Sequence, residues 1–170
     1  MEGGALSETS SGRVEALWTK RSHRGVMDAR TEATFVAGKG IDGNTCRSST
    51  RQVTIIAREQ WEAMMRELGA AVDPGARRAN LMVSGVDLEA SRGRTLRVGG
   101  VRIRIRGETR PCERMDEAHD GLRAAMDGQW RGGAFGEVLD DGLVTVGDAV
   151  TWETEAGAAP ATDASAAGSA

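Results

Sequence analysis

The stretch Leu96-Arg-Val-Gly-Gly-Val-Arg-Ile-Arg-Ile-Arg106 is the clearest β pattern in the sequence. Its central dipeptide, Gly99-Gly100, is typical of a two-residue hairpin turn. After the turn, Val101, Ile103 and Ile105 alternate with three arginines, so the apolar side chains share one face of a strand. The pattern predicts a hairpin with one buried face and one charged face.

Shorter β patterns flank this hairpin on both sides. We expect strands over residues 12–18, 31–36, 52–56 and 81–83 before it. After it, residues 135–139, 143–146 and 149–152 predict a meander whose turns are Asp141-Gly142 and Gly147-Asp148. Seven or eight short strands separated by glycine turns are typical of a mainly β fold with α, and we expect a barrel-like antiparallel core.

Helical spacing is found in two places, so we expect two or three helices at the rim of the barrel. One apolar stripe runs from Trp61 to Leu68 and ends at Gly69, which is the expected stop. A second stripe runs from Met115 to Met126 and ends at Gly128. His119 lies near the second stripe and is interpreted as a packing or surface histidine before a catalytic base.

Composition is consistent with one domain of 170 residues, which we place at residues 12–153. Residues 1–11 and 154–170 are small and polar, and we expect them to be disordered. Four acidic residues and no basic residue occur in these two ends, so the chain's net charge of −3 becomes about +1 for the core. A near-neutral core argues against nucleic-acid binding.

The sequence contains neither a signal-peptide pattern nor an apolar run long enough to span a bilayer, so we expect a cytoplasmic protein with no membrane partner. Cys46 and Cys112 are too few for a disulfide framework. With His23 and His119 they would make four possible zinc ligands, but there is no closely spaced pair of cysteines or of histidines, and a structural zinc site is not expected.

The stretch Gly107-Glu-Thr-Arg-Pro-Cys-Glu-Arg114 joins the hairpin to the second predicted helix. Cys112 therefore follows a proline, lies between arginines and precedes a helix N-terminus, a setting that favours a reactive thiolate. The alternative is a small buried cysteine behind a turn, and local context alone favours it because free cysteines are usually structural.

Other donor groups gather in predicted loops and at strand ends. Lys20, Arg21 and Ser22 form either a solvated basic turn or an anion site. The glycine-rich loop Gly38–Gly43 fits neither a Walker loop nor a dinucleotide-binding pattern. It leads to residues 44–51, which contain several phosphate-compatible donors. Further along the chain, Arg77-Arg-Ala-Asn80 precedes a short apolar strand.

Seven separate pieces together resemble the MOSC domain, the C-terminal domain of molybdenum cofactor sulfurases, and in particular its stand-alone bacterial members. They occur in the family's order across residues 12–153. They are Gly40-Ile-Asp-Gly43, Arg51-Gln-Val-Thr-Ile-Ile56, Arg78-Ala-Asn-Leu81, Gly85-Val-Asp-Leu88, Arg110-Pro-Cys112, Arg131-Gly-Gly133 and Val146-Gly-Asp148.

The resemblance implies a β-barrel-like fold that binds molybdenum cofactor (molybdopterin), and pyridoxal phosphate binding is not expected. It implies that Cys112 is the catalytic residue, which either ligates molybdenum or carries activated sulfur. The resemblance also implies that Arg78 and Asn80 hold the pterin and that the Lys20–Ser22 segment meets the phosphate. Ser49, Thr50, Arg51 and Arg110 complete the expected cofactor-binding set.

Some members of the family reduce N-hydroxylated compounds with electrons from a separate flavin or iron–sulfur partner, which makes this the expected activity on a small-molecule substrate. The alternatives are a sulfur or cofactor carrier without turnover, favoured by the absence of room for an electron-donor domain, and a binding module that has lost the cofactor. The last arises because Asn44-Thr45 replaces the family's Asp-Arg. Arg47 or Arg51 could replace the missing charge, and Cys46 is regarded as incidental.

Overall fold

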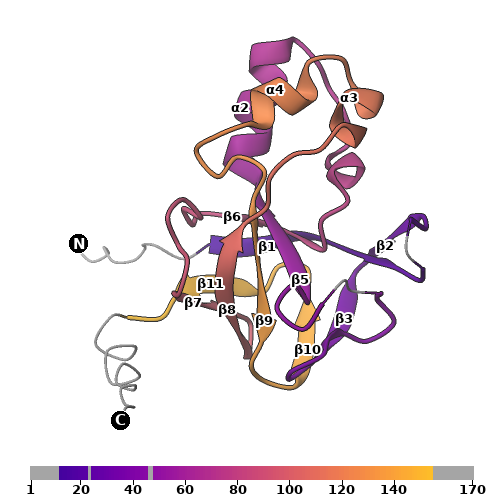
Figure 1. The fold of residues 1–170 in the computed structure, drawn as a ribbon. Coiled ribbons are helices and arrows are strands. Elements are labelled where there is room, and N and C mark those ends of the chain that lie inside the picture. Colours follow the sequence, from indigo (N-terminus) through magenta and orange to yellow (C-terminus); the bar gives the residue numbers. More distant parts are fainter. Residues whose placement is uncertain (1–11, 23, 46–47, 155–170) are drawn as a thin grey trace.

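The computed structural model describes residues 12–22, 24–45 and 48–154 (Figure 1). His23, Cys46, Arg47 and the two ends expected to be disordered, apart from Thr154, lie outside the described residues. The elements are, in order, β1 (Gly12–Lys20), β2 (Met27–Arg30), β3 (Glu32–Val36), β4 (Gly40–Ile41), β5 (Val53–Ala57), α2 (Arg58–Leu68), the 3-10 turn η1 (Pro74–Arg77), β6 (Leu81–Ser84), β7 (Thr95–Val98), β8 (Val101–Glu108), α3 (Arg114–Ala118), α4 (Leu122–Met126), β9 (Ala134–Val138), β10 (Gly142–Thr145) and β11 (Ala149–Trp152).

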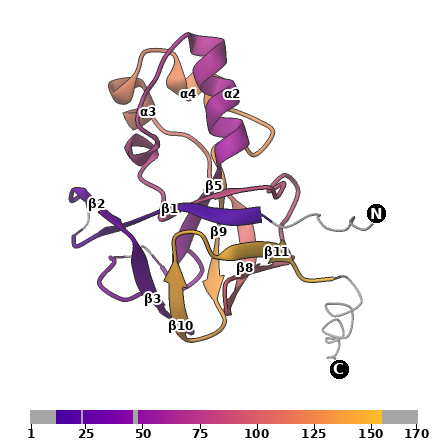
Figure 2. The same cartoon turned by 180° about the vertical axis from the view of Figure 1, so that it is seen from behind.

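Within the described residues, seven strands close a mixed β-barrel (Figures 1 and 2). Their order around the barrel is β11-β7-β8-β9-β5-β6-β1, and pairing of Gly12 with Val150 joins the last strand to the first. Strand β2 extends this sheet beyond β1, while β10, β3 and β4 form a second, three-stranded sheet. Phe35 and Val144 of that second sheet are fully buried in the same apolar core as the barrel strands.

The predicted hairpin is confirmed as β7 and β8, which pair through Val98 and Val101 around Gly99-Gly100. Gly99 has a positive φ of 59°, a conformation that glycine adopts readily. The apolar face of β8 is completely buried. Two of its outer arginines form ion pairs, Arg102 with Asp140 and Arg106 with Glu137, and the third, Arg104, donates to the Thr95 hydroxyl. The alternation in the sequence therefore places the core on one side of β8 and ion pairs on the other.

The expectation of an antiparallel core is wrong at one pair of strands. Strand β5 runs parallel to β6, with Ile55 opposite Leu81. Parallel neighbours need a crossover connection, and here α2 and η1 supply it. This connection places Arg77, Arg78 and Asn80 immediately before β6.

The predicted meander is also wrong, although its three strands form. Strand β9 pairs with β5 and β8, β10 pairs with β3, and β11 pairs with β7 and β1. The turn dipeptides reverse the chain, but the strands on either side of each turn pair with other strands. Asp141 accepts a hydrogen bond from the Ala37 amide, which ties the turn after β9 to the end of β3.

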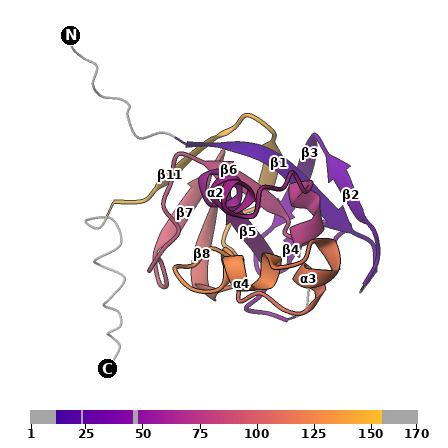
Figure 3. The same ribbon diagram turned by 90° about the horizontal axis from the view of Figure 1, so that it is seen from above.

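The helices lie together at one end of the barrel (Figures 1 and 3). Helix α2 ends as predicted at Gly69, with φ of 62°, and buries Trp61 and Met64. The second predicted helix is divided into α3 and α4 because Gly121, with φ of 88°, interrupts it. His119 lies in this break, half-buried, with its Nδ1 atom 2.9 Å from the Asp120 carbonyl. Among the described residues, no helix has the length and apolar character needed to cross a membrane.

The Arg102–Asp140 pair makes a testable contribution to stability. Asp140 accepts from the Arg102 amide (3.0 Å), Nε (2.9 Å) and Nη2 (3.1 Å). These side-chain hydrogen bonds lower the pKa of Asp140, so its contribution is present above the unfolded-state pKa and is lost as pH falls through the lower folded-state value.

We predict that Asp140→Asn lowers the free energy of unfolding at pH 7 by about 1 kcal/mol or less, because solvent screens this partly exposed pair. Urea unfolding at several pH values measures the effect. The deficit should shrink below about pH 4, where the unfolded carboxyl becomes protonated. Asp42→Asn, at an exposed position, is the control, and a deficit independent of pH would contradict the prediction.

Candidate functional site

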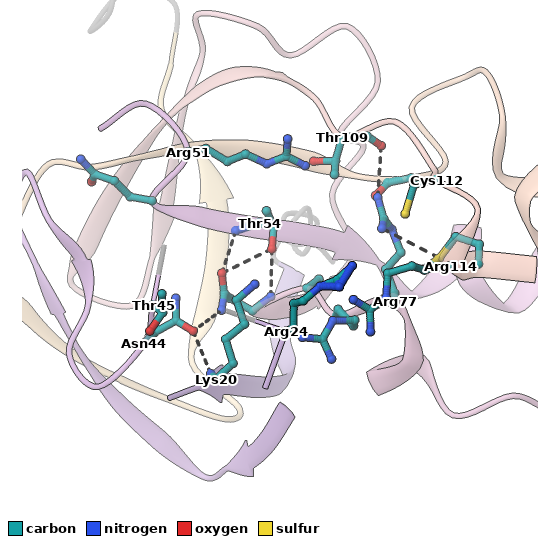
Figure 4. A pocket seen from close by; sticks show the side chains of 16 residues that line it. Lys20, Arg24, Asn44, Thr45, Arg51, Thr54, Arg77, Thr109, Cys112 and Arg114 are labelled. Carbon is teal, nitrogen blue, oxygen red and sulfur yellow. Dashed lines mark hydrogen bonds between the residues drawn. The ribbon is translucent and has the colours of Figure 1, made fainter. Parts of the chain in front are cut away.

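A cavity of about 340 Å³ opens between the barrel rim and the segments η1 and α3 (Figure 4). Its size lies within the range of about 300–1,000 Å³ that is usual for small-molecule sites. We call it the arginine pocket and define it by its lining residues. These are Lys20, Arg24, Asn44, Thr45, Arg51, Gln52, Thr54, Arg77, Arg78, Ala79, Asn80, Thr109, Cys112, Arg114, Met115 and Gly132.

The charge of the arginine pocket is one-sided. Six of its lining residues are lysine or arginine, and no aspartate or glutamate of the described part of the chain lines it. Like charges gathered around one cavity repel each other and create a strong positive potential. The lining therefore matches an anionic ligand, which would relieve this repulsion.

Arg77 is the buried cation of the pocket, with only 8% of its surface exposed. Its Nε donates to the Gly132 carbonyl at 3.1 Å, and its Nη2 donates to the Thr109 carbonyl at 3.3 Å. The described residues give it no carboxylate partner within salt-bridge distance. Burial lowers the pKa of Arg77 to about 10, an effect that Arg51 adds to and Cys112 opposes, so the guanidinium stays charged at neutral pH.

Gly132 allows this arrangement because it has no side chain. A Cβ atom at this position would lie 2.1 Å from the Thr109 carbonyl oxygen and 3.3 Å from Nη2 of Arg77. The neighbouring Arg131 holds the same loop from outside, because its guanidinium binds both carboxylate oxygens of Glu67 and also donates to the Ala125 carbonyl. These contacts give the sequence Arg131-Gly-Gly133 a structural explanation.

Cys112 lies on the loop between β8 and α3, at the edge of the pocket, and it is exposed (Figure 4). The buried-cysteine alternative is therefore wrong. Nearby, the Thr109 side-chain hydroxyl is buried and has no hydrogen-bond partner among the described residues. A buried hydroxyl without a partner carries a desolvation cost, which a hydrogen bond with a bound polar ligand would relieve.

Asn80 connects three parts of the pocket wall. Its Oδ1 accepts from the Thr54 amide at 3.0 Å, and its Nδ2 donates to the Trp18 carbonyl at 3.1 Å and to Asn44 Oδ1 at 3.2 Å. Strands β1 and β5 and the loop after β4 are thus joined through one buried side chain. Both amide hydrogens are used within the protein, so Asn80 shapes the wall through its contacts with the backbone.

The unusual pair Asn44-Thr45 has a local structural role. Asn44 Oδ1 also accepts from the Lys20 amide at 2.9 Å. Thr45 donates its hydroxyl to the Arg21 carbonyl at 3.0 Å, and its amide donates to the Lys20 carbonyl at 2.9 Å. These bonds attach the loop to the end of β1 without an arginine. Arg51 lies in the pocket lining, while Arg47 is outside the described residues.

The structure gathers part of the predicted site. Lys20, Arg51, Arg78, Asn80 and Cys112 line the arginine pocket. The remaining predicted residues do not line it. Arg21 pairs with Asp28, and Arg110 lies near Asp127 in a different surface depression. Ser22, Ser49 and Thr50 are exposed.

Sequence reasoning missed Arg77, Arg24, Arg114 and Thr109 as pocket residues. No local pattern in the Arg77–Asn80 stretch distinguishes the buried Arg77 from its half-buried neighbour Arg78. The distinction arises because Arg78 adopts a positive φ of 66°, which sends consecutive side chains to different sides of the pocket.

Comparison with known proteins identifies the family of this chain. The sequence model of the MOSC domain matches residues 22–151. The chain belongs to the MOSC domain family. No curated protein matches the sequence. The family membership expected from the seven ordered motifs is therefore confirmed.

Solved structures share the fold of this MOSC protein at low sequence identity. The YuaD protein of Bacillus subtilis is 20% identical, with a TM-score of 0.68, over 82% of this chain and 94% of that one. YiiM of Geobacillus stearothermophilus is 13% identical, with a TM-score of 0.67, over 84% and 75% of the two chains. YiiM of Escherichia coli is 16% identical, with a TM-score of 0.61, over 84% and 70%.

The Asn80 connection can be tested with two matched substitutions. Asn80→Asp replaces the amide donor Nδ2 with an oxygen that faces the Trp18 carbonyl and Asn44 Oδ1. Asn44→Asp keeps the side-chain oxygen with which Asn44 accepts its hydrogen bonds. Both place a carboxylate beside the same cationic pocket, so their difference isolates the lost donor. We predict that Asn80→Asp is less stable than Asn44→Asp by about 1–3 kcal/mol in urea unfolding. Equal stabilities would contradict this role of Asn80.

Proposed function

We propose that this protein binds molybdenum cofactor in the arginine pocket and reduces N-hydroxylated compounds. The observation that carries the proposal is the charge of the pocket: a buried Arg77 without a carboxylate partner among the described residues, in a lining that contains no acidic residue. A pterin with a phosphate and a dithiolene is an anionic ligand that would balance this charge.

The chemistry of the lining fits such a group. Arg77, Arg51 and Lys20 would hold its anionic parts, and the unpartnered Thr109 hydroxyl would supply a further hydrogen bond. Cys112 would supply a soft thiolate ligand to molybdenum. Among the described residues, no three His, Cys, Asp or Glu side chains gather as a metal cluster. A single protein thiolate beside the dithiolene needs no such cluster.

The bound group would supply a metal centre able to pass electrons to the substrate. Reduction of R–NH–OH breaks the N–O bond and consumes two electrons and two protons, giving R–NH₂ and water. A separate flavin or iron–sulfur protein would supply the electrons, and solvent would supply the protons. The protein's own groups orient the ligand and keep a positive field around the reacting end.

One observation favours a second candidate function. Cys112 is exposed on a loop, so a partner protein could reach its sulfur. A carrier that holds sulfur on Cys112 and passes it on would use this exposure without substrate turnover. A persulfide on Cys112 in a protein without reductase activity would favour the carrier.

The first test is the composition and activity of the purified protein. From a host that makes the cofactor, we predict molybdenum and pterin near one equivalent each, measured by elemental analysis and by pterin fluorescence after oxidation. Cys112→Ala should remain folded and should lower the reduction of 6-hydroxylaminopurine, with a chemical electron donor, by at least about 100-fold. A metal-free protein in which Cys112→Ala behaves like the wild type would contradict the proposal.

The second test concerns Arg77. We predict that Arg77→Gln lowers the pterin content at least about tenfold, because a charge-assisted contact to an anion is lost. Arg97→Gln on β7 is the matched control, since Arg97 pairs with Glu153 on the surface and does not line the pocket. Arg51→Gln, tested alongside, covers the case in which Arg77→Gln does not fold. Full pterin content in both pocket variants would show that these arginines do not hold the cofactor.

A further inference from the structure

Three arginines form a separate group at the mouth of the arginine pocket: Arg24 after β1, Arg78 after η1 and Arg114 at the start of α3. We call them the mouth arginines. Their charges act on one another, since Arg114 and Arg24 add to the effect of burial in lowering the pKa of Arg78. Three segments distant in the sequence thus bring three guanidinium groups to one place.

The mouth arginines have few partners within the protein. Arg78 donates from Nη2 to the Gly25 carbonyl at 2.7 Å. In the described part of the chain, none of the three forms an ion pair with a carboxylate. This contrasts with the arginines on the outside of the barrel, such as Arg102 and Arg106, which are paired with acidic residues. Unpaired guanidinium groups that converge on a cavity are suited to bind phosphate.

The mouth is distinct from the buried end of the pocket. Arg77 donates to the carbonyls of Thr109, which follows β8, and of Gly132, which precedes β9. Arg78 instead donates to the Gly25 carbonyl, in the hairpin between β1 and β2. Two consecutive side chains therefore serve two different ends of one cavity. Arg24 is exposed and Arg77 is buried, so the outer end is open to ligands that exchange with solvent.

We propose that the mouth arginines bind a phosphate group of the substrate, so that the protein selects phosphorylated N-hydroxylated compounds over neutral ones. This inference rests on the proposed function for the reacting end of the pocket. A resident cofactor is suited to the buried groups Arg77 and Thr109, and a substrate that enters and leaves is suited to the mouth arginines, of which Arg24 is exposed and Arg78 and Arg114 are half-buried. The positive mouth would also attract an anionic substrate from solution.

The test compares two probes that differ by one phosphate: 6-hydroxylaminopurine riboside and its 5′-monophosphate. Calorimetry on the purified protein, without an electron donor, measures the dissociation constant of each. We predict that the monophosphate binds at least about tenfold more tightly than the riboside. Arg24→Gln combined with Arg114→Gln should bring the two constants to within about threefold of each other. Arg123→Gln, an arginine on α4 outside this pocket, is the control and should keep the preference.

The outcomes separate this inference from the function on which it rests. Equal binding of the two probes to the wild-type protein would overturn the inference. Loss of molybdenum and pterin in the Arg24→Gln/Arg114→Gln variant would also overturn it, because these arginines would then hold the cofactor. A wild-type protein without molybdenum would overturn the proposed reductase, while the ratio of the two dissociation constants would still decide whether the mouth selects phosphate.

Discussion

A buried guanidinium that has no carboxylate partner among the described residues is the constraint on which the site depends. Arg77 is held by two main-chain carbonyls, from Gly132 and Thr109, and the absence of a side chain at Gly132 permits the contact. Such a charge is costly to bury. The cost is consistent with a pocket that binds an anion, and the neighbouring contacts of Asn80 keep strands β1 and β5 in the positions that form its wall.

Much of the barrel could be predicted from the sequence, because its information is local. The alternation of β8 and the turn at Gly99-Gly100 determine a hairpin without reference to the rest of the chain. The parallel pairing of β5 with β6 could not be predicted, since short apolar strands look alike whichever neighbour they pair with. The same limit explains the wrong meander: a turn dipeptide predicts a chain reversal, but tertiary contacts select the partner of each strand.

The candidate site also contains some residues that the sequence indicates and others that only the fold brings together. The order of the motifs identified the family, and four residues named from the motifs, Cys112, Arg51, Arg78 and Asn80, line one cavity. Arg77 and the mouth arginines follow from the path of the backbone: the positive φ of Arg78 directs it away from Arg77, and α3 brings in Arg114. No pattern of residue types along the chain contains that information.

We propose that the arginine pocket holds molybdenum beside Cys112. Crystals of the protein purified from a host that makes the cofactor, measured above and below the molybdenum absorption edge, test it most directly. We expect an anomalous peak inside the pocket, next to the Cys112 sulfur and on the side of Arg77 and Thr109. Crystals that contain molybdenum but show the peak elsewhere on the protein would contradict it.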